Sequence, residues 1–342
     1  MAALVVFKCC TASYAAAPIP LRCFMNWRDR EVLVTGGAGF IGSHIARRLL
    51  SEGARVHILI KKDESRWRIQ EVLTYLTVWE ADLADFASLQ HTLSHCNPHA
   101  VFHLAALVNS ARSWELVPDM IQNNIVGTAN LLMALKDRDC GVIVHTSSLE
   151  EYGFLNAPFI ETQRESPVSP YSFSKLSSTV FCQMAARIFN LPIHILRLSP
   201  TYGPAQEGPM LIPSAIHDLL IKKEFCMTAG EQLRDFIYID DVVEAFMRIA
   251  VQQHGFGEIY NVGTGLPRKV ADIVEIIQKY LGNDSVVRRG ALPYRKGEGM
   301  EAFGSNEKMK QLTGWTPVVS LEEGLKKTVE WYKDFLLKRP TM

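Results

Sequence analysis

The chain has 342 residues, and its 36 Lys and Arg residues balance 36 Asp and Glu, so the formal net charge is zero. This length allows a large core in one main domain. The balanced charge gives no general electrostatic reason for nucleic-acid binding. No apolar run reaches the roughly 18 residues of a membrane-spanning helix. We therefore expect neither a nucleic-acid partner nor a membrane.

Seven cysteines show neither C-x-x-C pairing nor the spacing of a metal site. We expect free thiols in a reducing compartment, and hence a cytoplasmic protein without a bound metal. The first 24 residues are rich in Ala, Cys and Pro and lack Asp and Glu. We expect residues 1–28 to form a poorly ordered leader; a transit-type leader is the alternative.

From Glu31 onward, short apolar runs alternate with amphipathic segments. Strands are predicted at 31–35, 54–60, 75–79, 100–104, 141–147 and 193–198. Helices are predicted between them at 40–52, 84–95, 118–137 and 171–190. This alternation predicts an α/β fold with a Rossmann-type, doubly wound parallel sheet over residues 29–198.

The rhythm changes after residue 198, where Pro and Gly cluster and the elements become shorter. Helices are predicted near 240–252, 269–281 and 320–337. We expect residues 199–338 to form mainly a smaller C-terminal substrate-binding lobe.

A glycine-rich turn follows the first predicted strand. Gly36, Gly39 and Gly42 stand in a G-x-x-G-x-x-G register, with Phe40 and Ile41 where the next helix begins. Small residues let the backbone approach phosphates, and the helix N-terminus offers N–H groups and a positive dipole end. The motif predicts a dinucleotide pyrophosphate site; by itself, an ordinary strand-to-helix turn would also explain it.

Residues after the third and fourth predicted strands would line the rest of a bound dinucleotide. Asp82, followed by Leu83, would contact the adenine. The small residues of Leu104-Ala105-Ala106 would form a wall beside the cofactor.

The end of the second strand bears on the choice of cofactor. An Asp or Glu there would bind the ribose 2′-hydroxyl of NAD, but Ile60 occupies that place and Lys61 and Lys62 follow. Two ammonium groups suit a 2′-phosphate, which favours NADP over NAD. Solvated loop lysines are the alternative interpretation.

A second motif, Tyr171-Ser172-Phe173-Ser174-Lys175, supplies groups for proton transfer. Tyr171 and Lys175 are four residues apart and therefore neighbours on one helix face. A phenol with a pKa of about 10 is a poor base at neutral pH, and a nearby ammonium group lowers that pKa. Ser148, where the fifth strand ends, would hydrogen-bond the reacting oxygen. Together with the glycine turn, these residues predict hydride transfer coupled to proton transfer.

Between about Glu31 and Trp331 the chain resembles an extended short-chain dehydrogenase/reductase of the nucleotide-sugar epimerase/dehydratase group. The motifs that carry the resemblance are the glycine turn, Asn124 to Thr128, Ser147-Ser148 with Tyr152-Gly153, Tyr171 to Lys175, Tyr202 to Pro204, Arg234 to Phe236, Tyr238 to Val242 and Gly314 to Pro317.

The resemblance implies roles for individual residues. Asn124 would structurally support a catalytic triad formed by Ser148, Tyr171 and Lys175. Arg234 and Arg295 would grip the diphosphate of a nucleotide sugar, because the forked donors of a guanidinium match phosphate oxygens.

Two departures from the family pattern bear on the reaction. Relatives that eliminate water carry an Asp or Ser and then a Glu directly after the triad hydroxyl, whereas here Leu149 precedes Glu150. Glu150 would contact the substrate; the alternative is that Glu150 and Glu151 are simply solvated loop charges. Pro200 stands where many relatives place a phosphate-contacting Asn, and proline has no N–H to donate.

We therefore expect NADPH-dependent reduction of a nucleotide-linked 4-keto-6-deoxyhexose at C4, with Tyr171 protonating the nascent alkoxide. An NAD-dependent nucleotide-sugar 4-epimerase or 4,6-dehydratase is the alternative. A non-catalytic, cofactor-binding regulatory scaffold is the alternative of another class. The resemblance also implies a homodimer through helices 118–137 and 171–190, although packing on the sheet equally explains their apolarity.

Overall fold

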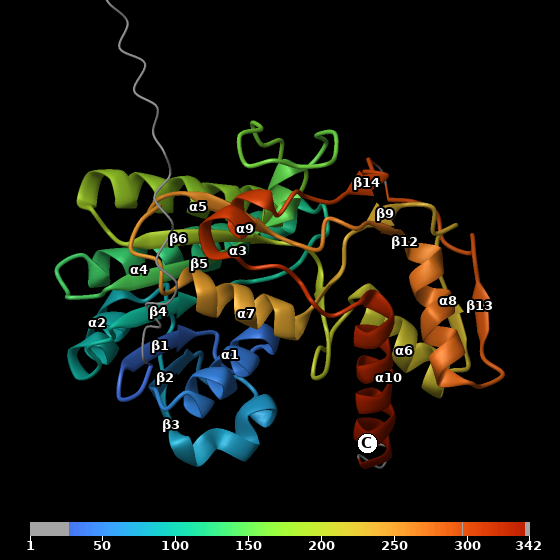
Figure 1. The fold of residues 1–342 in the computed structure, drawn as a ribbon, viewed down its shortest axis with the longest axis horizontal. Helices are drawn as coiled ribbons and strands as arrows, with labels where there is room; N and C mark the ends of the chain where they lie inside the picture. Colours follow the sequence, from blue (N-terminus) through green and yellow to red (C-terminus); the bar gives the residue numbers. More distant parts are fainter. Residues whose placement is uncertain (1–26, 296, 339–342) are drawn as a thin grey trace, which may run out of the picture.

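The computed structural model describes residues 27–295 and 297–338. Nearly all of the leader predicted over residues 1–28 lies outside these described residues. A parallel sheet of seven strands forms the centre of the larger part of the molecule (Figure 1). Its strands are β1 (Glu31–Thr35), β2 (Arg55–Ile60), β3 (Leu76–Glu80), β4 (Ala100–His103), β5 (Val142–Ser148), β6 (Ile193–Leu198) and β11 (Ile259–Val262). The predicted doubly wound α/β architecture is thus confirmed.

The strand order β11-β6-β5-β4-β1-β2-β3 reverses direction between β1 and β4. Open parallel sheets bind ligands at the carboxyl ends of strands beside such a switch point. Thr35 at the end of β1 pairs with His103 of β4, and His103 pairs with His145 of β5. The glycine turn after β1 and Ser148 at the end of β5 therefore emerge at one edge of the sheet.

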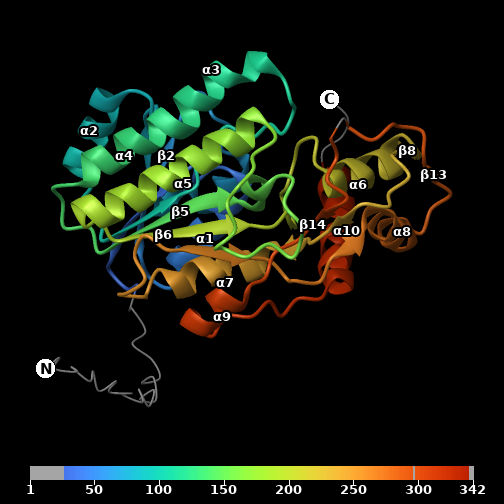
Figure 2. The same cartoon turned by 90° about the horizontal axis from the view of Figure 1, so that it is seen from above.

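Helices cover both faces of the sheet, and each face has its own apolar core. Figure 2 shows one layer on either side. One layer contains α2 (Phe86–His95), α4 (Gly127–Leu135) and α5 (Pro170–Phe189), and the other contains α1 (Phe40–Ser51) and α7 (Ile239–Ile249). Because both faces are covered, β4, β6 and β11 are buried along their whole length, which explains their continuous apolar runs.

The helix predicted over 118–137 is interrupted. It consists of α3 (Val117–Met120), a π-helical segment η3 (Ile121–Val126) and α4. Short π-helical segments inside helices are frequent at functional sites, and Asn124 lies in this one. Short 3₁₀ helices occur at η1 (Trp67–Tyr75), η2 (Trp114–Leu116) and η4 (Leu149–Tyr152).

The smaller lobe lies beyond the carboxyl edge of the sheet, where α6, α8 and α10 pack together (Figure 1). Its helices are α6 (Leu211–Ile221), α8 (Val270–Leu281) and α10 (Leu321–Lys338). Its strands are β8 (Glu224–Cys226), β13 (Val286–Arg288), β9 (Leu233–Arg234), β12 (Arg268–Lys269) and β14 (Glu301–Ala302). The linking elements are β7 (Thr201–Tyr202), β10 (Ile237–Tyr238) and α9 (Glu307–Thr313).

Part of the chain after residue 198 returns to the large sheet rather than to the lobe. β11 pairs with β6, and α7 packs beside α1 on one face. The pairing satisfies the backbone groups that β6 would otherwise leave open at a sheet edge. The proposed division of the chain at residue 198 stays a prediction. Within the described ranges, no helix combines the length and apolarity needed to cross a membrane.

Candidate active site

The glycine turn is built around backbone contacts that leave no room for side chains. Gly36 has a φ of +67°, and a Cβ on it would lie 2.9 Å from the backbone nitrogen of Ala105. A Cβ on Gly42 would lie 2.2 Å from the carbonyl oxygen of Gly36. Gly39 caps α1 without a side-chain acceptor, and the first N–H groups of a helix have no acceptor within it. This arrangement fits the pyrophosphate of a dinucleotide.

The structure brings together the residues expected around the adenosine end. The Lys61 ammonium lies 3.1 Å from the Asp82 carboxylate and donates to the Asn123 side chain at 2.5 Å. The Lys61 charge is therefore already compensated by Asp82. Leu83 packs against Gly127 of α4. Lys62 is exposed and forms no ion pair with any described residue.

The start of α5 fixes the position of Tyr171. Ser169 and Ser172 form reciprocal caps, with Ser172 N–H donating to the Ser169 hydroxyl at 3.1 Å and Ser169 N–H donating to the Ser172 hydroxyl at 3.0 Å. Pro170 occupies the first helical position, where its missing N–H costs nothing. The helix therefore begins one residue before Tyr171.

Ser148, Tyr171 and Lys175 meet at the end of β5. The Tyr171 phenol is hydrogen-bonded to the Ser148 hydroxyl, and Lys175 lies one helical turn further along α5. The Lys175 ammonium donates to the Thr146 carbonyl oxygen. Tyr171 and Lys175 are both buried.

Asn124 ties η3 to α5. Its side-chain amide donates to Ser174 at 2.8 Å and to the Leu107 carbonyl at 3.0 Å, and its oxygen accepts from Leu107 N–H at 2.7 Å. The amide thereby joins α5 to the loop that follows the Leu104–Ala106 wall. This geometry suits a supporting role for Asn124.

The pKa of Tyr171 is raised, whereas we expected Lys175 to lower it. Burial is the main cause, and the Glu150 and Glu151 carboxylates add to it, while the Ser148 hydrogen bond opposes it. Burial lowers the pKa of Lys175 to about 8, and Glu151 opposes that change. Burial and the two carboxylates thus raise the pKa of the Tyr171 phenol, and the Ser148 hydrogen bond does not offset them.

Glu150 lies between the triad and a group of arginines. Its N–H donates to the Ser148 hydroxyl at 3.2 Å, and its carboxylate lies within the field of Arg295, Arg112 and Arg234. The side chain is solvent-accessible, yet the surrounding protein displaces enough water to raise the pKa of the carboxyl against these arginines. Glu150 thus lies beside Ser148 and within the field of three arginines, and its contact with a substrate stays a prediction.

The two arginines predicted to bind phosphate both lie near Glu150, but they differ in their partners. Arg234 is paired with Glu298 and donates to the Gly299 carbonyl at 2.8 Å. Arg295 donates to the Ser110 hydroxyl at 3.3 Å. Arg112, the third of these arginines, was not predicted, because the loop after β4 that carries it shows no motif.

The interpretation of Glu151 as a solvated loop charge is wrong. Glu151 is fully buried and paired with Arg197 of β6, whose Nη2 lies 2.6 Å from its carboxylate. Arg197 is also paired with Glu165. The fully buried β6 could have suggested this, because an arginine within such a strand needs a buried counter-charge.

The carbonyl oxygen of Pro200 accepts a backbone hydrogen bond from Ile237 N–H at 3.0 Å.

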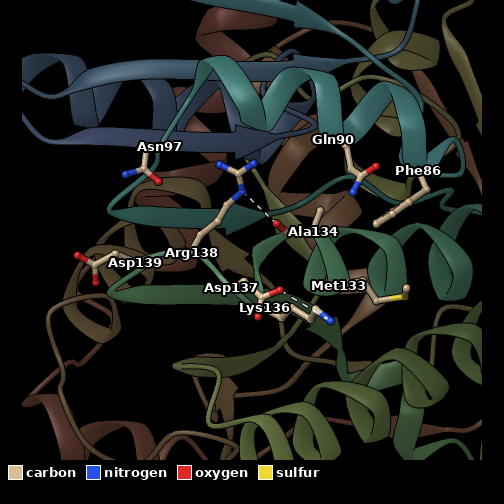
Figure 3. Close-up of a pocket in the computed structure, with 9 residues that line it drawn as sticks. All are labelled: Phe86, Gln90, Asn97, Met133, Ala134, Lys136, Asp137, Arg138 and Asp139. Carbon is tan, nitrogen blue, oxygen red and sulfur yellow. Dashed lines mark hydrogen bonds and ion pairs between the residues drawn. The ribbon is translucent and has the colours of Figure 1, made fainter.

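Figure 3 shows a surface hollow between α2 and the end of α4, lined by Phe86, Gln90, Met133 and neighbouring residues. The residues that line it include none of the predicted site residues. We therefore place the active site at the carboxyl edge of the sheet and not in this hollow.

One group of potential metal ligands appears that the spacing of cysteines did not reveal. Donor atoms of Glu31, His57 and Cys96 lie within 4.8 Å of one another. However, Trp79 donates to His57 Nδ1 at 3.1 Å. A metal on either nitrogen of a neutral His57 ring would break that bond, since coordination at Nε2 requires a proton on Nδ1. We assign no metal to this group.

Comparisons with known proteins agree with this geometry. The family model for GDP-mannose 4,6 dehydratase matches residues 33–328. The chain is 31% identical over 313 residues to a UDP-glucuronate 4-epimerase of Thermodesulfobacterium geofontis, covering 88% of this chain and 96% of that protein. It is 32% identical over 341 residues to a dTDP-glucose 4,6-dehydratase of Escherichia coli, with coverages of 88% and 93%.

Two solved structures have the same fold. A UDP-glucose 4-epimerase of Thermotoga maritima, solved with UDP-glucose, superposes with a TM-score of 0.82 at 30% identity, covering 90% of this chain and 99% of that one. A dTDP-glucose 4,6-dehydratase of Streptomyces venezuelae, solved with NAD, gives 0.83 at 30% identity, with coverages of 90% and 98%. The chain therefore belongs to the nucleotide-sugar epimerase/dehydratase family of extended short-chain dehydrogenases/reductases, which are NAD(P)-dependent enzymes.

Proposed function

We propose that the protein is a nicotinamide-dependent oxidoreductase that acts at C4 of a nucleotide-linked sugar, with 4-epimerisation as its overall reaction. The observation that carries this proposal is the meeting of Ser148, Tyr171 and Lys175 at the same sheet edge as the glycine turn. The arginines around Glu150 support a substrate that carries a diphosphate. The relatives, which by name act on UDP- and dTDP-linked sugars, support the same class.

The residues of the site have separable tasks in this proposal. The glycine turn and the first N–H groups of α1 hold the cofactor pyrophosphate, and Ser148 orients the reacting hydroxyl. A bound NAD(P)⁺ supplies the hydride acceptor and a positive charge. Because a nearby positive charge lowers the pKa of a phenol, Tyr171 becomes a competent base in the cofactor-bound enzyme and returns the proton when the ketone is reduced.

The contacts of Lys61 support NAD as the cofactor. Its charge is compensated by Asp82, so its attraction for a 2′-phosphate is weakened. Lys62 has no such partner among the described residues, and the preference for NADP expected from both lysines stays a prediction. Protein purified without added nicotinamide, denatured and analysed by mass spectrometry would show which cofactor it retains.

Leu149 favours reactions without loss of water. It is buried and packs with Tyr152 and Phe159, and its hydrocarbon side chain neither donates nor accepts a proton where dehydratases of the family use such a group. Leu149 therefore counts against 4,6-dehydration without excluding it, and favours 4-epimerisation or C4 reduction. Reduction of a 4-keto-6-deoxy sugar is the second candidate function, favoured by the exposed Lys62, which has no ion-pair partner among the described residues and is free to bind the 2′-phosphate of NADPH.

A substrate panel separates these reactions. Protein would be assayed with UDP-glucose, UDP-glucuronate, dTDP-glucose, GDP-mannose and a nucleotide-linked 4-keto-6-deoxy sugar. We expect interconversion of a C4 epimer pair without net cofactor use, lost in Tyr171→Phe. Consumption of NADPH with the keto sugar alone would establish the reductase instead. Folded, cofactor-bound protein that turns over none of them would contradict the proposal.

Exposed apolar side chains on one face support the predicted homodimer. Phe173 and Val180, seven residues apart on α5, are 46% and 51% exposed, and Ile121 on η3 is 39% exposed. Residues at this spacing share one helix face, and η3 packs against α5. Light scattering would show a dimer, and Phe173→Glu with Val180→Glu would yield a monomer.

A further inference from the structure

A fully buried ion pair, Glu151 with Arg197, lies close to the proposed catalytic residues. The Glu151 carboxylate accepts from Arg197 Nε at 2.8 Å and lies 2.6 Å from Arg197 Nη2. It also accepts from Thr179 at 3.0 Å and from the Ser147 hydroxyl. The guanidinium carbon of Arg197 lies 4.6 Å from the centre of the Tyr152 ring. The proposed mechanism uses none of these groups.

The partners of Glu151 belong to the elements that carry the catalytic side chains. Ser147 directly precedes Ser148 on β5. Thr179 lies four residues after Lys175 on α5 and hence on the same helix face. Arg197 belongs to β6, the next strand of the sheet. We propose that Glu151 is a positioning residue whose buried carboxylate joins β5, α5 and β6 and holds Lys175 as an ammonium ion.

The hydrogen bonds indicate that Glu151 is ionised. Burial raises the pKa of its carboxyl, and Arg197 opposes this. Its oxygens accept from a guanidinium and two hydroxyl groups, and protonating them would displace one of these donors. Glu151 in turn raises the pKa of Arg197. The pair is therefore a carboxylate beside a guanidinium.

Among the described residues, Glu151 is the negatively charged group that acts on Lys175 at neutral pH. Burial keeps the pKa of His103 at about 3 and raises that of Cys182 to about 12, so both are neutral. The titratable and charged groups that act on Lys175 are Glu151 from η4, His103 from β4, neutral His145 from β5 and Cys182 from α5. The carboxylate opposes the burial that would strip Lys175 of its proton.

The direct test titrates Lys175 by NMR in the full chain, with lysine labelled with ¹³C at Cε. We expect the Lys175 signal to titrate near pH 8, and its loss in Lys175→Met identifies it. In Glu151→Gln we expect this titration to move to lower pH by roughly one unit or more, since a neighbouring opposite charge shifts a pKa by about 1–3 units. Although the role of Glu151 rests on the proposed function, this measurement requires no substrate, so its failure is distinct from a failure of the substrate panel.

Glu165→Gln is the matched control, because Glu165 pairs with the same Arg197 but contacts neither Ser147 nor Thr179. Its Lys175 titration should stay at the wild-type pH. An unchanged titration in folded Glu151→Gln, or an equal change in both variants, would overturn the proposal. Should Glu151→Gln fail to fold, Glu151→Leu with Arg197→Met removes both buried charges, and Lys175 should again titrate at lower pH. For the substrate found with the panel, both limbs of the pH–rate profile should move to lower pH in Glu151→Gln and not in the control.

Discussion

Burial of the charged Lys175 should lower the free energy of unfolding of the protein, and Lys175→Met should remove this destabilisation. The pKa of Lys175 is about 8 in the folded protein against an ordinary value of 10.5. A difference of this size corresponds to about 3 kcal/mol of destabilisation at neutral pH. The variant loses the hydrogen bond to Thr146, worth about 1.5–3 kcal/mol for a charged donor. We therefore expect Lys175→Met to raise the free energy of unfolding by up to roughly 1.5 kcal/mol at pH 7 while activity is lost.

The gain should depend on pH in a defined direction. Since burial lowers the folded-state pKa of Lys175, the penalty is complete below about pH 8 and disappears as the pH rises to 10.5. Urea unfolding of wild type and variant at pH 7 and at pH 10 measures the difference directly. A variant that is less stable than wild type at pH 7, or a stability difference that is equal at both pH values, would refute the reasoning.

Three further predictions test the rest of the site. Gly42→Ala places a Cβ 2.2 Å from the Gly36 oxygen. Relieving this overlap costs about 1–3 kcal/mol and should weaken dinucleotide binding about tenfold or more by fluorescence titration. In Gly39→Ala the Cβ would lie 3.1 Å from the same oxygen, a milder overlap, so this variant should lose less affinity. Tyr171→Phe should retain cofactor affinity but lower kcat by about 10²-fold or more, and an active variant would remove Tyr171 from the mechanism. If Asp82 already compensates the charge of Lys61, Lys61→Ala should change the affinities for NAD and NADP by similar factors. A selective loss of NADP affinity of about tenfold would instead support the predicted preference for NADP.

Local patterns in the sequence were sufficient to predict much of the fold. The alternation of buried strands and amphipathic helices predicted six of the sheet strands to within one residue at each end, because burial on both faces demands continuous apolar runs. The seventh strand, β11, was not predicted. It is four residues long, and its place beside β6 depends on a pairing between segments about 60 residues apart.

Some features of the candidate site follow from the local sequence, and others depend on tertiary contacts. The glycine turn and the Tyr171–Lys175 pair depend on neighbours within a few residues, so the sequence by itself determined them. Tertiary structure decided what depends on separate elements meeting: Asp82 compensates Lys61, Glu151 and Arg197 form a buried pair, and burial with Glu150 raises the pKa of Tyr171. Charge partners and desolvation depend on distances in space, and no local pattern of residues encodes those distances.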